Sequence, residues 1–141
     1  MAAITVTAAS VARVDGEVLN GYLAGATITA GQSVYVDSNG AVQVGTNASS
    51  AGSGVSAAAV GIALNGGGSG QPIAILKNGT VNIGGTVAVG KQYVLGTSGG
   101  IIPVDDVAGS EYITTVGVGA TAANIKLGYN VSGVAAAGAV S

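Results

Sequence analysis

Apolar residues along this chain occur in short runs rich in Val, Ile, Thr and Tyr, and Gly, Asn and Ser interrupt the runs at short intervals. This pattern, with turns about every 8–12 residues, is typical of an all-β domain. Helix is scarce, because its one modest candidate, Ser10–Leu23, contains Gly16 and Gly21, which argue against it. We expect strands at Ile4–Thr7, Ala26–Thr29, Ser33–Val36, Ala41–Val44, Ala58–Leu64, Pro72–Leu76, Thr80–Ile83, Gln92–Leu95, Ile101–Val104, Tyr112–Gly119 and Ala123–Tyr129.

Two Gly- and Ser-rich segments separate some of these strands. We expect Gly45–Ala58 (GTNASSAGSGVSAA) and Leu64–Gln71 (LNGGGSGQ) to be flexible surface loops. The whole pattern predicts a compact β-barrel or sandwich of short strands with extended terminal arms. We divide the chain into residues 1–25, an N-terminal arm and lead-in strand; residues 26–130, a β-barrel domain; and residues 131–141, an Ala/Gly-rich C-terminal tail.

The polar cluster Asp37-Ser38-Asn39-Gly40 lies between two apolar runs and is either a ligand-binding loop or a turn. A turn of Asn39-Gly40 alone would mix apolar and polar residues on one face of the hairpin. A loop of Ser38-Asn39-Gly40 keeps that face apolar, and the buried face sets the register, so we predict the longer loop with Gly40 in the left-handed conformation. The predicted cross-strand pairs are Val36–Val42, Val34–Val44 and Tyr35–Gln43.

An internal sequence repeat indicates a duplication of this hairpin. With a constant offset of 59, the segment from Thr27 to Val44 lies over the segment that begins at Thr86, so that Gly31 matches Gly90 and Gly40 matches Gly99. Two further pairs of segments recur in the same order, namely AVGIAL with TVGVGA and PIAIL with NIKLG. Two similar halves of this kind would pack face to face, each covering the apolar face of the other.

Composition then limits how such a domain is built and solvated. The chain has 141 residues, near the usual size of one domain, and its 26 Gly with no Phe or Trp leave a core of Val, Ile, Leu and Ala. Charged residues make up 7% of the chain, and the net charge is −2. A surface with so few charges is poorly solvated in a free monomer, so we expect an obligate assembly.

The same composition argues against two kinds of partner. The four basic residues, Arg13, Lys77, Lys91 and Lys126, are scattered and cannot supply a row of phosphate contacts, so nucleic acid is not an expected partner. Polar residues interrupt every apolar run before it reaches about 18 residues, so no membrane span is expected. The N-terminal stretch lacks the basic region of a secretory signal peptide, and none is expected.

Candidates for catalysis are few. The chain contains no His and no Cys, which excludes Ser-His-Asp and Cys-His arrangements and thiolate metal sites. Asp105 and Asp106 are adjacent, so in an extended segment their side chains point to opposite faces and would not share a substrate. A solvated loop explains this pair better. Asp15 and Glu17 form at best a weak cation site, because hard cations need several more oxygens. We therefore predict that the protein is not an enzyme and has no catalytic, cofactor-binding or metal-binding residues.

Other motifs are better explained by structure. The three Lys lie beside turn residues, with no sign of the desolvation that an active Lys needs. NGGGSGQ lacks the features of a phosphate-binding or dinucleotide-binding loop. The five Tyr fit packing at the edge of a core better than a sugar-binding platform, and the sequons at Asn47, Asn78 and Asn130 are expected by chance in so Asn- and Thr-rich a chain. The tyrosines are Tyr22, Tyr35, Tyr93, Tyr112 and Tyr129.

Several turn-and-strand motifs occur together in a recognisable order. They are TAGQSVYVDSNGAVQV, then AVGIALNGGGSGQPIAILKNGTV, then GGTVAVGKQYVLGTSGGIIPV, and they cover about Ala26 to Tyr129. This series resembles the small capsid decoration, or cement, proteins of tailed bacteriophages. The long NASSAGSGVSA loop and the very low charge depart from the pattern and leave the capsid-facing side unassigned.

The resemblance implies a compact β-barrel that clusters as trimers, or in some members dimers, on the outside of an icosahedral head. Such a protein is made in the host cytoplasm and locks neighbouring subunits of the major capsid protein together. By analogy, Met1–Ala9 or the tail Val131–Ser141 would cross onto a neighbour. The alternatives are a carbohydrate- or receptor-binding β module on a virion or cell surface, with the Gly/Ser loops as the contact, and a hydrolase that uses only carboxylates.

Overall fold

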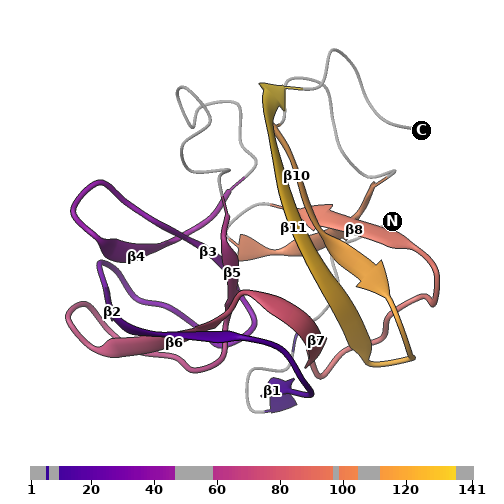
Figure 1. Ribbon diagram of the computed structural model, residues 1–141, viewed down its shortest axis with the longest axis horizontal. Helices are drawn as coiled ribbons and strands as arrows, with labels where there is room; N and C mark the ends of the chain where they lie inside the picture. The colour runs from indigo at the N-terminus through magenta and orange to yellow at the C-terminus, as the bar shows by residue number, and fades with distance from the viewer. Residues whose placement is uncertain (1–5, 7–9, 47–58, 97–98, 105–111, 136–141) are drawn as a thin grey trace.

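A computed structural model describes Val6 and residues 10–46, 59–96, 99–104 and 112–135, with Tyr112 and residues 130–135 described by their backbone. The described residues are all-β and contain no α-helix, as the sequence predicted. The strands are β1 (Ala12–Arg13), β2 (Val18–Ala24), β3 (Ser33–Val36), β4 (Ala41–Val44), β5 (Gly61–Ala63), β6 (Pro72–Leu76), β7 (Asn78–Asn82), β8 (Gln92–Leu95), β9 (Ile101–Pro103), β10 (Tyr112–Gly119) and β11 (Asn124–Ala135). They form a closed barrel and a separate sheet, which lie side by side (Figure 1).

The barrel consists of β2-β4-β3-β5-β6, and β6 pairs with β2 to close it. Its hairpin β3–β4 has the predicted register, because Val36 pairs with Val42, Val34 with Val44 and Tyr35 with Gln43. The Gly40 N–H donates to the Asp37 carbonyl, and Gly40 has a φ of 80°. The inward-facing apolar side chains of this hairpin therefore fill the barrel, together with Ala24, Ile28, Ala63, Ile73 and Ile75.

The sheet has the order β1-β7-β11-β10-β8-β9. When β1 is set aside, the order β7-β11-β10-β8-β9 repeats that of the barrel, β2-β6-β5-β3-β4. The registers repeat as well, since the pair Val34–Gly61 corresponds to Tyr93–Gly117. Hairpin β8–β9 pairs Tyr93 with Pro103, Val94 with Ile102 and Leu95 with Ile101, which is the β3–β4 register moved by the offset of 59. The structure thus repeats one five-stranded arrangement twice, in agreement with the predicted duplication.

A second apolar cluster joins the two halves. Ile62 and Leu76 of the barrel strands β5 and β6 point away from the barrel interior and into this cluster, where both are 0% exposed. The sheet contributes Val81, Leu95, Ile101, Val116 and Ile125. Period-2 alternation on β5 explains the arrangement, because Ile62 faces the sheet while its neighbour Ala63 faces the barrel interior. The halves therefore cover each other's apolar faces.

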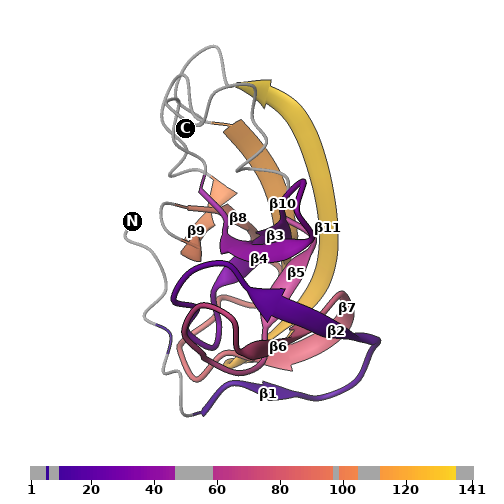
Figure 2. The ribbon, with the colours of Figure 1, turned by 90° about the vertical axis from the view of Figure 1, so that its left-hand side faces the viewer.

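Closure distinguishes the two halves. In the barrel, β2 pairs in parallel with β4, and the Gly25 N–H donates to the Val42 carbonyl. Gly84 occupies the corresponding place in the second half, but its N–H donates to the Asn82 side chain and its φ is 68°. Strand β7 consequently turns away from β9, and β1 pairs with β7 instead (Figure 2). The second half is an opened copy of the barrel.

Some predicted elements were wrong. Ala26–Thr29 is not a strand, because only Ile28 forms a bridge, to Gly67. Ser10–Leu23, where Gly16 and Gly21 argued against a helix, contains β1 and most of β2. The barrel therefore takes a strand from residues 1–25, and β11 continues past residue 130 to Ala135. The predicted strand Ile4–Thr7 lies outside the described residues except for Val6, which is in no strand.

Candidate functional site

The Asp37 turn uses its polar groups within the hairpin. Asp37 Oδ1 accepts the N–H groups of Asn39 at 2.9 Å and Ala41 at 3.0 Å, and Oδ2 accepts the Gln43 side-chain amide at 2.9 Å. These hydrogen bonds, the one from Gln43 above all, hold the pKa of Asp37 below its usual value. The carboxylate thus stabilises the hairpin tip, in agreement with the interpretation of this cluster as a turn.

Asp15 and Glu17 lie where the turn between β1 and β2 crosses the start of β7. Asp15 Oδ1 accepts the Thr80 N–H at 2.7 Å, and the Glu17 N–H donates to Asn78 Oδ1 at 2.9 Å. The Glu17 carboxylate is 4.0 Å from the Lys77 ammonium, and both side chains are more than half exposed. Within the ranges that the structure describes, no three acidic side chains gather as a metal site. The two residues instead fasten the first turn to β7.

The remaining sequence candidates are dispersed. Asp105, Asp106 and Asn47 lie outside the described residues. Tyr93 is 3% exposed, and its hydroxyl accepts the Ala88 N–H at 2.9 Å, so its ring cannot form a sugar-binding platform. Lys126 is exposed on β11, whereas Lys77 lies between β6 and β7 and Lys91 directly precedes β8.

The loop Leu64–Gln71 lies at the surface as predicted, but many hydrogen bonds hold it. Asn65 Oδ1 accepts the Ala74 N–H at 2.7 Å, and its amide donates to the Pro72 carbonyl at 3.0 Å. Gln71 Oε1 accepts the Gly68 N–H at 2.7 Å, and Gly67 and Ile28 exchange two backbone hydrogen bonds. The two amide side chains thus give a Gly-rich segment a fixed backbone path.

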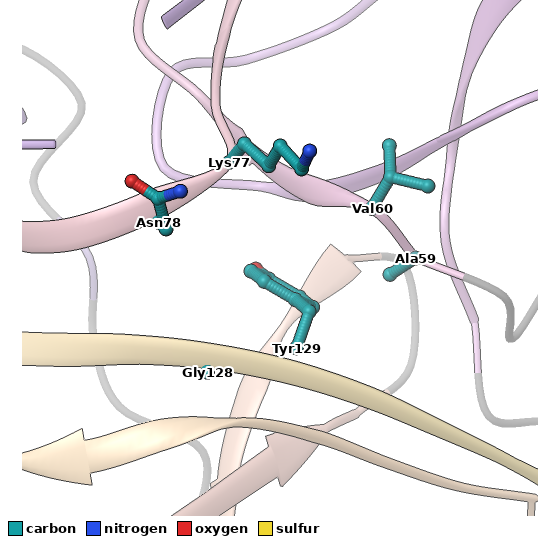
Figure 3. Close-up of a pocket in the computed structure, with 6 residues that line it drawn as sticks. All are labelled: Ala59, Val60, Lys77, Asn78, Gly128 and Tyr129. Atoms are coloured by element: carbon teal, nitrogen blue, oxygen red, sulfur yellow. The ribbon is translucent and has the colours of Figure 1, made fainter. Parts of the chain in front are cut away.

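Sequence reasoning missed a hollow of about 430 Å³ between the two halves. Figure 3 shows the Tyr129 side chain rising from β11 toward the segment that carries Lys77 and Asn78, with Ala59 and Val60 on one side. Gly128 also lines the hollow, and a Cβ atom there would meet nothing within 4 Å. The walls are mostly apolar, with one ammonium group and one amide at the rim.

The Tyr129 hydroxyl is anchored below this hollow. It lies 2.8 Å from the hydroxyl of Ser33, which is 0% exposed, and this hydrogen bond connects β11 of the sheet with β3 of the barrel. Part of the Tyr129 ring is exposed to solvent, but its hydroxyl end is enclosed. Burial raises the pKa of Tyr129 above its ordinary value, so the hydroxyl stays protonated at neutral pH.

The hollow combines residues from distant parts of the sequence. Ala59 and Val60 precede β5, Lys77 and Asn78 lie at the junction of β6 with β7, and Gly128 and Tyr129 lie on β11. Asn78 was singled out only as a sequon and Lys77 only as a possible active lysine. No local motif marks their convergence, because it depends on the crossing of the chain from the barrel to the sheet.

No family model matches this chain, and no curated protein matches it either. Among the residues that the structure describes, none belongs to a helix long and apolar enough to cross a membrane.

Proposed function

We propose that this protein is a virion structural protein that decorates the outer surface of an icosahedral phage capsid and bridges subunits of the major capsid protein. The resemblance of its ordered turn-and-strand motifs to phage decoration proteins motivates the proposal. Its role is structural and not catalytic, and it acts as a homo-oligomer, a trimer or a dimer, on heads assembled in the host cytoplasm.

The observation that carries the proposal is the sparsely charged β surface of the duplicated fold. Among the residues that the structure describes, five large apolar side chains are exposed, namely Val14, Leu23, Val60, Val89 and Val118, with exposed fractions from 36% to 69%. Over the whole chain, 7% of the residues are charged, and Thr, Ser and Asn are more frequent than any charged residue. A surface of this kind suits attachment by shape and by strand addition, because charge steering needs clusters of one sign.

Co-sedimentation tests the proposal. The purified full chain is mixed with empty heads that were assembled from the major capsid protein of the same phage without this chain. We expect saturable binding that changes little with salt, because exposed ion pairs contribute little to such a contact. Decorated heads should also withstand higher temperature than bare heads. A chain that stays in the supernatant at every concentration would refute the proposal, and specific binding to a glycan array would indicate the carbohydrate-binding alternative.

A further inference from the structure

The strands β10 and β11 extend beyond the rest of the sheet. Strand β11 pairs with β7 from Asn124 to Gly128, and β10 pairs with β8 from Thr115 to Val118. Beyond these limits β10 and β11 pair with each other, up to Tyr112 opposite Ala135. Figure 1 shows this ribbon rising past β8 and past the barrel. An isolated two-stranded ribbon is only marginally stable in water, so a further strand would stabilise this extension.

The free edge of β11, which we define as Tyr129–Ala135, lacks the usual protection of an edge strand. Among the described residues no strand pairs with it on the side that β7 occupies earlier in β11. The outer strands of the sheet are protected, because β9 has 3 residues and contains Pro103, and β1 has 2 residues and contains Arg13. The part of β10 beyond its pairing with β8 is short and spans only Tyr112–Thr114. The sequence YNVSGVA of the free edge has no Pro and no charged residue. It is therefore the edge best suited to pair with another strand.

The hollow between the two halves lies at the beginning of this edge. Strand β7 begins at Asn78, which pairs with Gly128 of β11, and the chain before Asn78 comes from the barrel strand β6. Asn78, Gly128 and Tyr129 all line the hollow. A strand that continues the line of β7 along the free edge would therefore begin at this hollow. The hollow and the free edge of β11 are adjacent.

We propose that the free edge of β11 pairs antiparallel with the same edge of a second copy of this chain, about a twofold axis at Ser132. An uncharged strand pairs with itself without repulsion between like charges. Isologous pairing also covers both free edges at once, whereas head-to-tail addition would leave a new edge exposed. In this arrangement Ser132, the middle residue of the free edge, faces Ser132 of the partner subunit, and the two sheets become continuous.

This inference goes beyond the proposed function and stands without it, because self-association is measured on the purified full chain in the absence of heads. Sedimentation velocity should show a dimer that dissociates on dilution. Ser132→Lys and Ser132→Glu should each weaken dimerisation by at least about tenfold, since directly opposed side chains lie roughly 5 Å apart and like charges repel there. An equimolar mixture of the two variants should restore the dimer.

Ser38→Lys is the matched control, because Ser38 is an exposed residue at the tip of the β3–β4 hairpin, and this variant should dimerise like the unmodified chain. Circular dichroism verifies that each variant is folded. A monomer at the highest soluble concentration, a trimer, unchanged dimerisation of both Ser132 variants, or a mixture that fails to reassociate would each overturn the inference.

Amide hydrogen exchange of the unmodified chain gives a second measurement that needs no variant. Backbone amides of the free edge that point away from β10 should lose protection on dilution, while Ile125 and Leu127, which lie opposite β7, should keep theirs. Protection of those outward-pointing amides that does not depend on protein concentration would contradict pairing with a second copy.

Discussion

The hydrogen bond between the Tyr129 and Ser33 hydroxyls joins β11 of the sheet to β3 of the barrel, over 2.8 Å. Tyr129→Phe keeps the ring and removes the phenolic oxygen, which leaves the fully buried Ser33 hydroxyl without this partner. A buried polar group that loses its hydrogen bond costs about 1–3 kcal/mol. We expect the free energy of unfolding to fall by that amount, which corresponds to a decrease in Tm of roughly 3–9 °C for a chain of this length.

A double-mutant cycle separates this bond from other effects of the substitution. Ser33→Ala should cost about 1–3 kcal/mol, because it leaves the enclosed Tyr129 hydroxyl without this partner. The double variant should cost less than the sum of the single variants, by about 1 kcal/mol, since removing both partners leaves no buried hydroxyl unpaired. Urea unfolding at one fixed protein concentration measures all four proteins. Additive losses, equal within about 0.3 kcal/mol, would refute a bond between the two halves.

The raised pKa of Tyr129 adds a pH dependence to the same comparison. In the unfolded chain Tyr129 ionises near its ordinary value of 10.0, whereas burial keeps it protonated in the folded state. The unfolded state then binds fewer protons than the folded state, so stability falls as the pH rises above about 10. Tyr129→Phe lacks this loss, and the difference in stability between the unmodified chain and this variant should shrink from pH 8 to about pH 11. A difference that stays constant over this range would contradict the burial of the hydroxyl.

Substitutions at the hairpin tip, at two glycines and at Asn82 test three other contacts. The depressed pKa of Asp37 stabilises the fold above the ordinary value of 3.8, and this stability is lost as the pH falls through the lower folded value. Asp37→Asn should remove this acid-dependent loss. Free energies of unfolding that fall in parallel with pH in the two proteins would contradict this. Gly61→Ala should cost about 1–3 kcal/mol in chemical denaturation, because its Cβ would collide with the Leu76 carbonyl, whereas the control Gly128→Ala should be nearly neutral, and equal effects would refute the packing argument. Asn82→Ala should lower the free energy of unfolding by about 1 kcal/mol, since it removes the acceptor 2.8 Å from the Gly84 N–H, and an unchanged Tm would count against that role.

Local patterns predicted the hairpins correctly because the information that sets them is local. In β3–β4, alternating valines fix the face, and Asp37 and Gly40 fix the turn, so bounds and register both follow from the sequence. The offset of 59 carried the same register to β8–β9. Strand β2 was missed, because its exposure does not alternate regularly along Val18–Ala24. Its partners β4 and β6 are distant in sequence, and only their pairing makes this segment a strand.

The candidate site was predictable only in part. The sequence identified the Asp37 cluster as a turn and indicated that the surface is nearly uncharged, and these interpretations rest on residues that are neighbours or on whole-chain composition. The hollow and the free edge of β11 depend on where distant segments meet. Strand β11 was predicted to end at Tyr129, yet its pairing with β10 continues to Ala135. An extension of this kind follows from the partner strand and not from propensity.

The two halves differ in closure, and the predicted duplication did not indicate that one half would close as a barrel while the other stays open. Leu23 and Gly25 of the barrel correspond to Asn82 and Gly84 of the sheet. Leu23 has no side-chain acceptor, so the N–H of Gly25 bonds to β4 and the barrel closes. The Asn82 side chain instead accepts the N–H of Gly84, and a positive φ at Gly84 turns the chain away. The Asn82 side-chain oxygen satisfies the Gly84 N–H locally, so pairing that closed the second half would gain no hydrogen bond from this donor. One Leu-to-Asn difference between the repeats, together with a glycine that tolerates the turn, thus leaves the second half as an open sheet.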